Sequence, residues 1–295
     1  MHRRLKSPGN RIFAVVVAVL SAAGPSAAAP ETLRISGSTT LTPIAAKAAE
    51  RFRKRHRGVR VFVSPTGSGA GIAAMASGTA DIGMASREID PDERKRFPKA
   101  DFVVTPAARD AVVPVVSAAV YEAGVTALSL ADLRRIYSGE AANWKAFGGP
   151  DAEILVIDKE ASRGTRHVFM GAVFGDEKAK APGARLVTGS NNEEQAAVSQ
   201  SDAAIGMLSN AWMNERVRGL AIKTADGAVA PTLENVLSGR FPISRNLNFV
   251  TDGPPRGLAK RFIDFVLSPE GQSIVEELGY VAVAETGRDQ SGKGR

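Results

Sequence analysis

The chain of 295 residues is long enough for two medium-sized domains, and with 44% hydrophobic and 23% charged residues it has the composition of a folded protein. It contains no cysteine and only three histidines, which excludes disulfides, thiol nucleophiles, thiolate metal sites and a cysteine-linked lipid anchor. The formal net charge of +7 raises the question of an anionic partner.

The first 28 residues have the pattern of a secretory signal peptide. Four basic residues precede an apolar run from Ile12 to Leu20, and small residues follow it. These nine apolar residues would form about 14 Å of helix, too little to cross a hydrocarbon core of roughly 30 Å. We therefore expect cleavage after Ala28 and a periplasmic protein rather than a membrane-anchored one.

Export removes most of the excess positive charge. Residues 1–28 hold four basic residues and no acidic one, so the mature chain has 34 basic and 31 acidic residues. The expected flexible tail, 288–295, accounts for two more charges and leaves a body of +1. The basic cluster Arg51–Arg57 fits the last turns of a helix that ends at Gly58, where cations complement the helix dipole. We expect no nucleic-acid partner.

Strand-like and helical segments alternate along the mature chain, which favours an α/β fold with largely parallel sheets. The N-terminal half has strands near 33–35, 59–63, 80–84 and 111–116, with helices near 42–56, 70–77 and 129–139. Further strands are expected near 153–157, 203–207 and 247–251, a capping box at Ser190–Glu193, and a last helix capped by Ser268 and stopped by Gly279.

Three turns between a strand and a helix share a composition suited to oxyanions. They are Ser36–Thr40, Thr66–Gly71 and Ser162–Thr165. Each supplies backbone N–H groups at a helix start together with short hydroxyls, and glycine permits close approach of the backbone. One such turn is ordinary cap composition, whereas three in one chain indicate an anion site.

Enzyme motifs fit these turns poorly. There is no G-x-x-x-x-G-K-[ST] loop and no G-x-S-x-G elbow, and the G-x-G-x-x-A pattern at Gly69–Ala74 is short and common in sequence rich in alanine and glycine. His167 is the one histidine close to one of these turns. It is better interpreted as a residue on a helix face than as a catalytic base.

With these turns in view, the sequence resembles the periplasmic phosphate-binding proteins of ABC transporters. The resemblance covers nearly the whole mature chain. Its further motifs are Asp81–Arg87, Ala108–Asp110, Leu130–Gly139 with Asn143 and Trp144, Ser190–Asn192, Ala204–Gly206, Phe241–Arg245, and Phe265–Gln272 with Gly279 and Tyr280.

The resemblance implies a type II periplasmic binding protein: two α/β domains, each with a central, mostly parallel sheet flanked by helices, joined by a hinge of two chain crossings. The first domain would hold 29–108 plus 240–287, and the second 109–239. The implied function is to capture inorganic phosphate between the domains and deliver it to an ABC transporter permease. No enzymatic activity, cofactor or metal is expected, and the protein is expected to be a monomer.

The same resemblance implies the ligand groups. They are Ser38, Thr39, Thr40, Ser68, Gly69, Asp81, Arg87, Arg163, Gly164 and Thr165. Asp81 would matter most, because a carboxylate accepts the proton of hydrogen phosphate and repels sulfate, which has none.

One motif departs from the family pattern of arginine, three residues, then Ser-Gly-Thr. Here Lys159 stands where the arginine belongs and Arg163 where the serine belongs. Either Arg163 makes the bidentate contact with the anion or Lys159 acts as a point charge; we favour Arg163, with Arg87 and Arg166 nearby.

Two other functions remain open from the sequence. The same fold could bind another oxyanion, such as sulfate or molybdate, or sense phosphate rather than deliver it. Less well supported is an enzyme that uses the glycine-rich turn for a phosphoester.

Overall fold

The computed structural model describes residues 30–283, so the expected signal peptide and the tail 288–295 lie outside the described residues. Within this range no helix is long and apolar enough to span a bilayer. The strands are β1 (Glu31–Gly37), β2 (Val59–Ser64), β3 (Ile82–Ala85), β4 (Phe102–Ser117), β5 (Ala127–Ser129), β6 (Leu155–Lys159), β7 (Leu186–Thr188), β8 (Ala204–Ser209), β9 (Val217–Gly219), β10 (Ala221–Thr224), β11 (Gly227–Val229), β12 (Ser244–Asp252) and β13 (Val281–Ala282). The helices are α1 (Thr42–Arg55), α2 (Ser68–Ala76), α3 (Pro91–Arg96), α4 (Ala118–Glu122), α5 (Leu130–Tyr137), α6 (Gly164–Phe174), α7 (Asn191–Ser199), α8 (Leu233–Leu237), α9 (Gly257–Leu267) and α10 (Pro269–Glu277), with short 3₁₀ segments η1 (Trp144–Phe147) and η2 (Asn210–Trp212).

The main sheet is mixed, with strand order β2-β1-β3-β12-β4-β8-β6-β7. The expectation of largely parallel sheets holds for β2-β1-β3 and for β8-β6-β7. It is wrong for β4 and β12, which run antiparallel to their neighbours. Strand β4 carries the chain from one end of the molecule to the other, and β12 returns it. The two strands are therefore antiparallel, unlike strands that are joined by βαβ crossovers.

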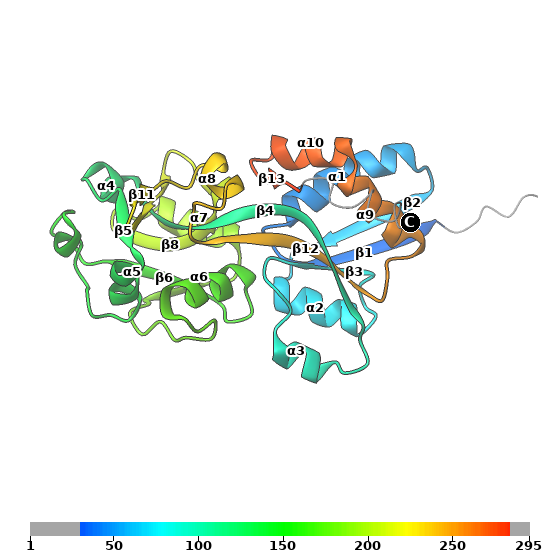
Figure 1. The fold of residues 1–295 in the computed structure, drawn as a ribbon, viewed down its shortest axis with the longest axis horizontal. Coiled ribbons are helices and arrows are strands. Elements are labelled where there is room, and N and C mark those ends of the chain that lie inside the picture. The colour runs from blue at the N-terminus through cyan, green and yellow to red at the C-terminus, as the bar shows by residue number, and fades with distance from the viewer. Residues whose placement is uncertain (1–29, 284–295) are drawn as a thin grey trace, which may run out of the picture.

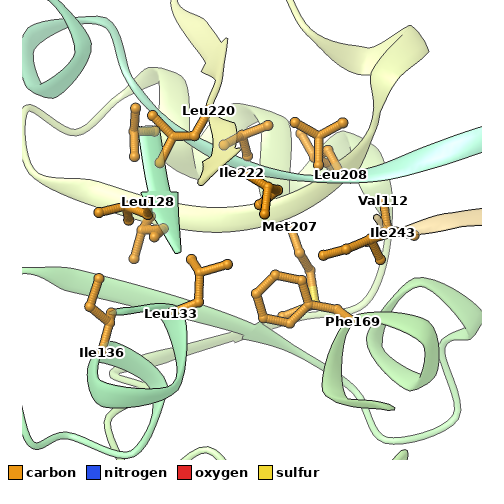
Figure 2. Close-up of a cluster of buried hydrophobic side chains, with 14 of the residues drawn as sticks. Val112, Leu128, Leu133, Ile136, Phe169, Met207, Leu208, Leu220, Ile222 and Ile243 are labelled. Carbon is orange, nitrogen blue, oxygen red and sulfur yellow. The ribbon is translucent and has the colours of Figure 1, made fainter. Parts of the chain in front are cut away.

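The fold has two lobes (Figure 1). We call the part built on residues 33–108 and 247–280 the first lobe, and the part built on residues 111–243 the second lobe, whose core is shown in Figure 2. Buried hydrophobic residues form one large cluster in the second lobe, and a large and a small cluster in the first. Strand β4 contributes to both large clusters, with Ala107 in the first lobe and Val112 in the second. Strand β12 places Leu247 in the first lobe, and Ile243, the residue just before β12, lies in the core of the second. These two long strands therefore connect the lobes.

Local cap signals explain where several helices begin. Pro43 lies in the first turn of α1, Ser129 forms a capping box with Asp132, and Ser268 caps α10 ahead of Pro269. Ser190 caps α7 as expected, but its capping box is incomplete because the Glu193 carboxylate accepts from the N–H of Gly189 at 2.7 Å instead.

Candidate anion-binding site

A small polar cavity lies where the two lobes face each other. Its lining contains hydroxyl, amide, cationic and glycine residues and no carboxylate. The lining residues are Ser38, Thr39, Thr40, Gly67, Ser68, Ser86, Lys159, Arg163, Gly164, Thr165, Gly189 and Asn191.

The strand directions place these residues together. Because β1, β2 and β3 are mutually parallel, the turns that follow them open at one edge of the first lobe. In the second lobe, β6 and β7 are likewise parallel, and the residues after them face the same cavity. The helices α1, α2, α6 and α7 all start there, so four positive helix ends converge on one space.

Backbone donors at this point are free to bind a ligand. Within residues 30–283, the N–H groups of Thr39, Ser68, Gly164 and Thr165 have no hydrogen-bond acceptor. The side chains of Ser68 and Thr165 are also almost fully buried, at 1% and 3% exposure. An anion that accepted from these groups would satisfy donors that the helix starts leave open.

Two cations reach the cavity, and each is paired with a carboxylate behind it. The Lys159 ammonium contacts the carboxylate of Glu194, and both side chains are fully buried. Burial lowers the pKa of Lys159 and raises the pKa of Glu194 to about 6, although Lys159 itself favours the ionised carboxylate. Arg163 is held by Glu160, with an Nε–Oε2 distance of 2.8 Å.

A third cation, Arg245 of β12, underlies the cavity. It forms a two-point ion pair with the fully buried Asp110, at 2.7 and 3.0 Å. The same guanidinium donates to Thr165 at 3.1 Å and to the Ser86 carbonyl at 3.1 Å. Arg245 thus links both lobes from the strand that connects them.

Direct hydrogen bonds also join the lobes around the cavity. The Asn191 amide donates to Thr40 Oγ1 at 3.0 Å, and the N–H of Gly69 donates to the Ser162 carbonyl at 3.2 Å. The lobes are therefore in contact, and a ligand in the cavity would be enclosed by both.

Seven of the ten expected site residues line this cavity: Ser38, Thr39, Thr40, Ser68, Arg163, Gly164 and Thr165. Gly69 and Arg87 lie next to it. The Gly69 N–H is used in the contact with the second lobe, and the Arg87 guanidinium is occupied by Glu93 at 2.7 and 2.8 Å.

The structure does not bring Asp81 to the cavity. Asp81 lies at the amino end of β3, whereas Ser86, at the carboxyl end, lines the cavity. Five residues of an extended strand span about 16 Å, so Asp81 and Ser86 lie about that far apart. The Asp81 carboxylate accepts from Arg34 at 2.7 and 3.0 Å; burial alone would raise its pKa, but these contacts lower it overall. Asp81 therefore does not lie where it could accept the proton of a phosphate in the cavity.

The sequence interpretation missed several lining residues. Gly67 and Ser86 lie inside the motifs Thr66–Gly71 and Asp81–Arg87 but are not among the expected ligand groups. Gly189 and Asn191 flank the cap at Ser190, and Lys159 is the alternative to Arg163 for the cation. His167, the catalytic alternative, is not among the lining residues; its ring nitrogen Nε2 is 2.8 Å from the Ala161 carbonyl.

Comparison with known proteins identifies the family of this chain. A model of the PBP superfamily domain matches residues 22–270. The phosphate-binding protein PstS of Bacillus subtilis is 32% identical over 266 residues, covering 88% of this chain and 84% of that protein. The chain belongs to the PstS-like proteins of the PBP superfamily. PstS of Borreliella burgdorferi is 30% identical over 256 residues, covering 84% of this chain and 89% of that protein.

Solved structures of PstS-like proteins share the fold. A structure from Clostridium perfringens with bound phosphate, described as a phosphate ABC transporter substrate-binding protein, superposes with a TM-score of 0.77 at 31% identity. The superposition covers 86% of this chain and 100% of the chain from Clostridium perfringens. An ABC-type phosphate transport receptor from Vibrio cholerae gives a TM-score of 0.68 at 31% identity, with coverage of 85% and 100%.

Proposed function

We propose that this protein captures inorganic phosphate in the cavity between its lobes and presents it to the permease of an ABC transporter. The main support for this proposal is that four helix starts, buried hydroxyls and two cations converge on a cavity that no carboxylate lines. The PstS relatives and the phosphate-bound structure from Clostridium perfringens support phosphate as the anion. The function is binding and transport, not catalysis.

In this proposal the first lobe corresponds to a domain of residues 29–108 plus 240–287, and the second to a domain of residues 109–239. Strands β4 and β12 would form the two-crossing hinge, because β4 contributes side chains to both large cores and β12 leads from Ile243 of the second core to Leu247 of the first. The observed contacts between Asn191 and Thr40 would then belong to the closed, ligand-holding arrangement.

The ligand would be held mainly by hydrogen bonds. The free N–H groups of Thr39, Ser68, Gly164 and Thr165 would donate to phosphate oxygens, and Lys159 and Arg163 would supply positive charge. Serine and threonine hydroxyls both donate and accept, so one of their oxygens would accept the hydrogen bond from the P–OH group of hydrogen phosphate in place of the expected carboxylate. Delivery would take place in the periplasm, by a monomer, after removal of the signal peptide.

Isothermal titration calorimetry tests the proposal. We expect one phosphate per chain, weaker binding of sulfate and molybdate, and a loss of affinity of at least about tenfold in Ser68→Ala, since a buried donor to an anion contributes about 1.5–3 kcal/mol. Ser77→Ala is the matched control, because Ser77 lies exposed at the other end of α2. Tight binding of sulfate or molybdate with no heat from phosphate would refute the assignment.

A further inference from the structure

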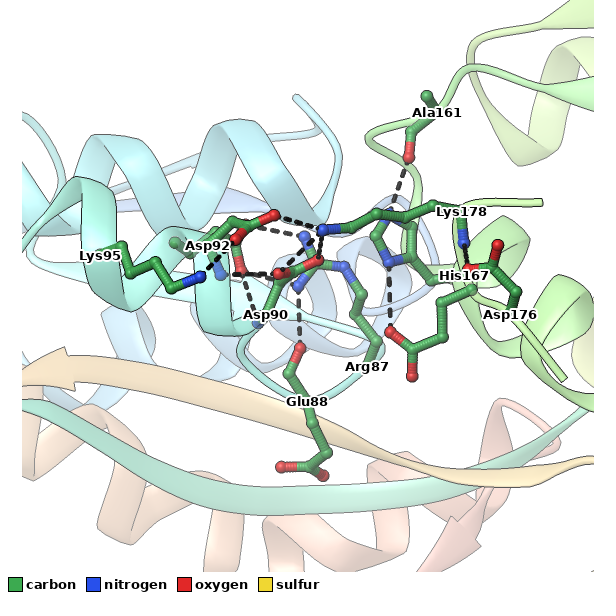
Figure 3. Close-up of polar contacts among 11 residues, drawn as sticks. Arg87, Glu88, Asp90, Asp92, Lys95, Ala161, His167, Asp176 and Lys178 are labelled. Atoms are coloured by element: carbon green, nitrogen blue, oxygen red, sulfur yellow. Dashed lines mark hydrogen bonds and ion pairs between the residues drawn. The ribbon is translucent and has the colours of Figure 1, made fainter. Parts of the chain in front are cut away.

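A second group of ionisable side chains bridges the lobes beside helix α3, outside the anion cavity. Asp90, which precedes α3 in the first lobe, and His167, on α6 in the second lobe, are labelled in Figure 3. Glu177 follows α6 in the second lobe. One ligand atom from each of the three residues lies within 4.8 Å of the other two. None of the three lines the anion cavity.

His167 is arranged as a metal ligand would be. Its side chain is 9% exposed, and its Nδ1 atom is buried with no hydrogen-bond partner in the described part of the chain. The Nε2 atom is 2.8 Å from the Ala161 carbonyl, so Nε2 carries the proton and the lone pair of Nδ1 points toward the two carboxylates. A backbone carbonyl that fixes the tautomer in this way is the usual outer partner of a histidine that binds a metal.

The two carboxylates complete the group. Asp90 is held in place as the cap of α3, accepting from the N–H of Asp92 at 2.8 Å, and its side chain is 7% exposed. The Glu177 carboxylate is 3.7 Å from His167 Nδ1 and 61% exposed. Two ligand atoms about 2.1 Å from one ion lie at most about 4.2 Å apart. The pair of His167 and Glu177 already meets this limit, and the exposed Glu177 side chain has room to adjust toward Asp90.

The local charge favours a divalent cation. Among the ion pairs of the described residues, Asp90 and Asp92 pair with Lys178 and Lys95, Glu177 pairs with His167 alone, and Arg87 pairs with Glu93. With Asp176 beside Lys178, the group therefore has more carboxylates than lysines. The Lys178 ammonium now contacts both Asp90 and Asp92, at 3.2 and 2.5 Å. Because this lysine is 54% exposed, it can stay with Asp92 when an ion takes Asp90.

We propose that Asp90, His167 and Glu177 form a site for a divalent transition-metal ion of the Zn²⁺ class that bridges the two lobes. One imidazole and two carboxylates with room for water match the three-ligand sites of zinc. Ca²⁺ and Mg²⁺ take oxygen ligands and would make no use of the imidazole. The ion would also stabilise the segment 160–167, since His167 is held against Ala161 two residues before Arg163.

Calorimetric titration of metal-free protein with ZnCl₂, in phosphate-free buffer and without a polyhistidine tag, tests the proposal. We expect one Zn²⁺ per chain and at least about tenfold weaker binding in His167→Ala and in Glu177→Gln, because even outer partners of a ligand cost 10–100-fold. Asp90→Asn should weaken binding similarly while keeping the helix cap, since asparagine caps as well as aspartate.

His56→Ala is the matched control, because His56 is the other histidine of the described chain and lies at the end of α1. Absence of saturable Zn²⁺ binding up to about 100 µM, unchanged affinity in Glu177→Gln, or equal affinity for Ca²⁺ would each overturn the site. Phosphate titration of the same samples is a separate measurement, so failure of this site leaves the proposed function testable.

Discussion

A Cβ atom placed on Gly164 would lie 2.5 Å from the Oγ atom of Ser68, and closer still to Ser86 Oγ. Gly164 starts α6 in the second lobe, and both serines belong to the first, so this glycine sets how closely the two walls of the cavity approach. Position 164 has no space for a side chain, and glycine is the only residue without one.

We therefore expect Gly164→Ala to weaken phosphate binding by at least about tenfold, because relieving such an overlap costs about 1–3 kcal/mol and 1.4 kcal/mol is tenfold in affinity. Calorimetry gives the affinity. Gly171→Ala, on the same helix, is the control, since its Cβ would meet only the Cγ atom of the exposed Glu177 at 3.2 Å. Wild-type affinity in Gly164→Ala would show that the lobes do not need this approach.

Asp81→Asn should leave the preference for phosphate over sulfate unchanged within about twofold, because Asp81 pairs with Arg34 at the far end of β3. A small loss of thermal stability is the expected effect, since the ion pair is partly exposed. The ratio of the two dissociation constants checks this. A marked loss of preference would return Asp81 to the site.

Arg245→Met should destabilise the protein by about 3–5 kcal/mol, because it leaves the fully buried Asp110 without its partner. Urea unfolding measures the change. Arg261→Met removes the exposed pair between Arg261 and Glu31 and should cost less than about 1 kcal/mol. Similar losses in the two variants would mean that Asp110 finds another partner.

The buried pair of Lys159 and Glu194 predicts that the folding stability of the protein depends on pH. The pKa of Glu194 is raised to about 6, so the folded protein binds this proton more tightly than the unfolded chain, whose pKa is near 4.5. The stability that this provides is complete below about pH 4.5 and is lost as the pH rises through about 6.

Glu194→Gln removes the titration. The unfolding free energy of the variant should therefore rise relative to wild type by about 2 kcal/mol between pH 4.5 and pH 7, which corresponds to the shift of the pKa. Denaturant unfolding at both pH values measures this difference. A constant difference between the two proteins would mean that the Glu194 carboxyl titrates normally.

Local sequence chemistry is enough to predict the alternation of strands and helices, most helix starts and the three turns that border the cavity. These depend on local chemistry: Ser129 and Ser268 cap their helices by accepting from the N–H three residues later, and the turn at Ser162–Thr165 leads directly into α6. Seven of the ten ligand groups that the family resemblance implies line the cavity, and their role in binding stays a prediction.

Which groups meet depends on the tertiary structure. A strand motif does not say which of its ends faces the ligand, so the sequence points to Asp81 although Ser86, five residues later, lies at the cavity. Arg245 and Asp110 are 135 residues apart, and their pairing follows from the antiparallel register of β12 and β4. Likewise, Asp90 meets His167 only because the lobes pack together, and contacts of this kind depend on the path of the whole chain and not on any short pattern.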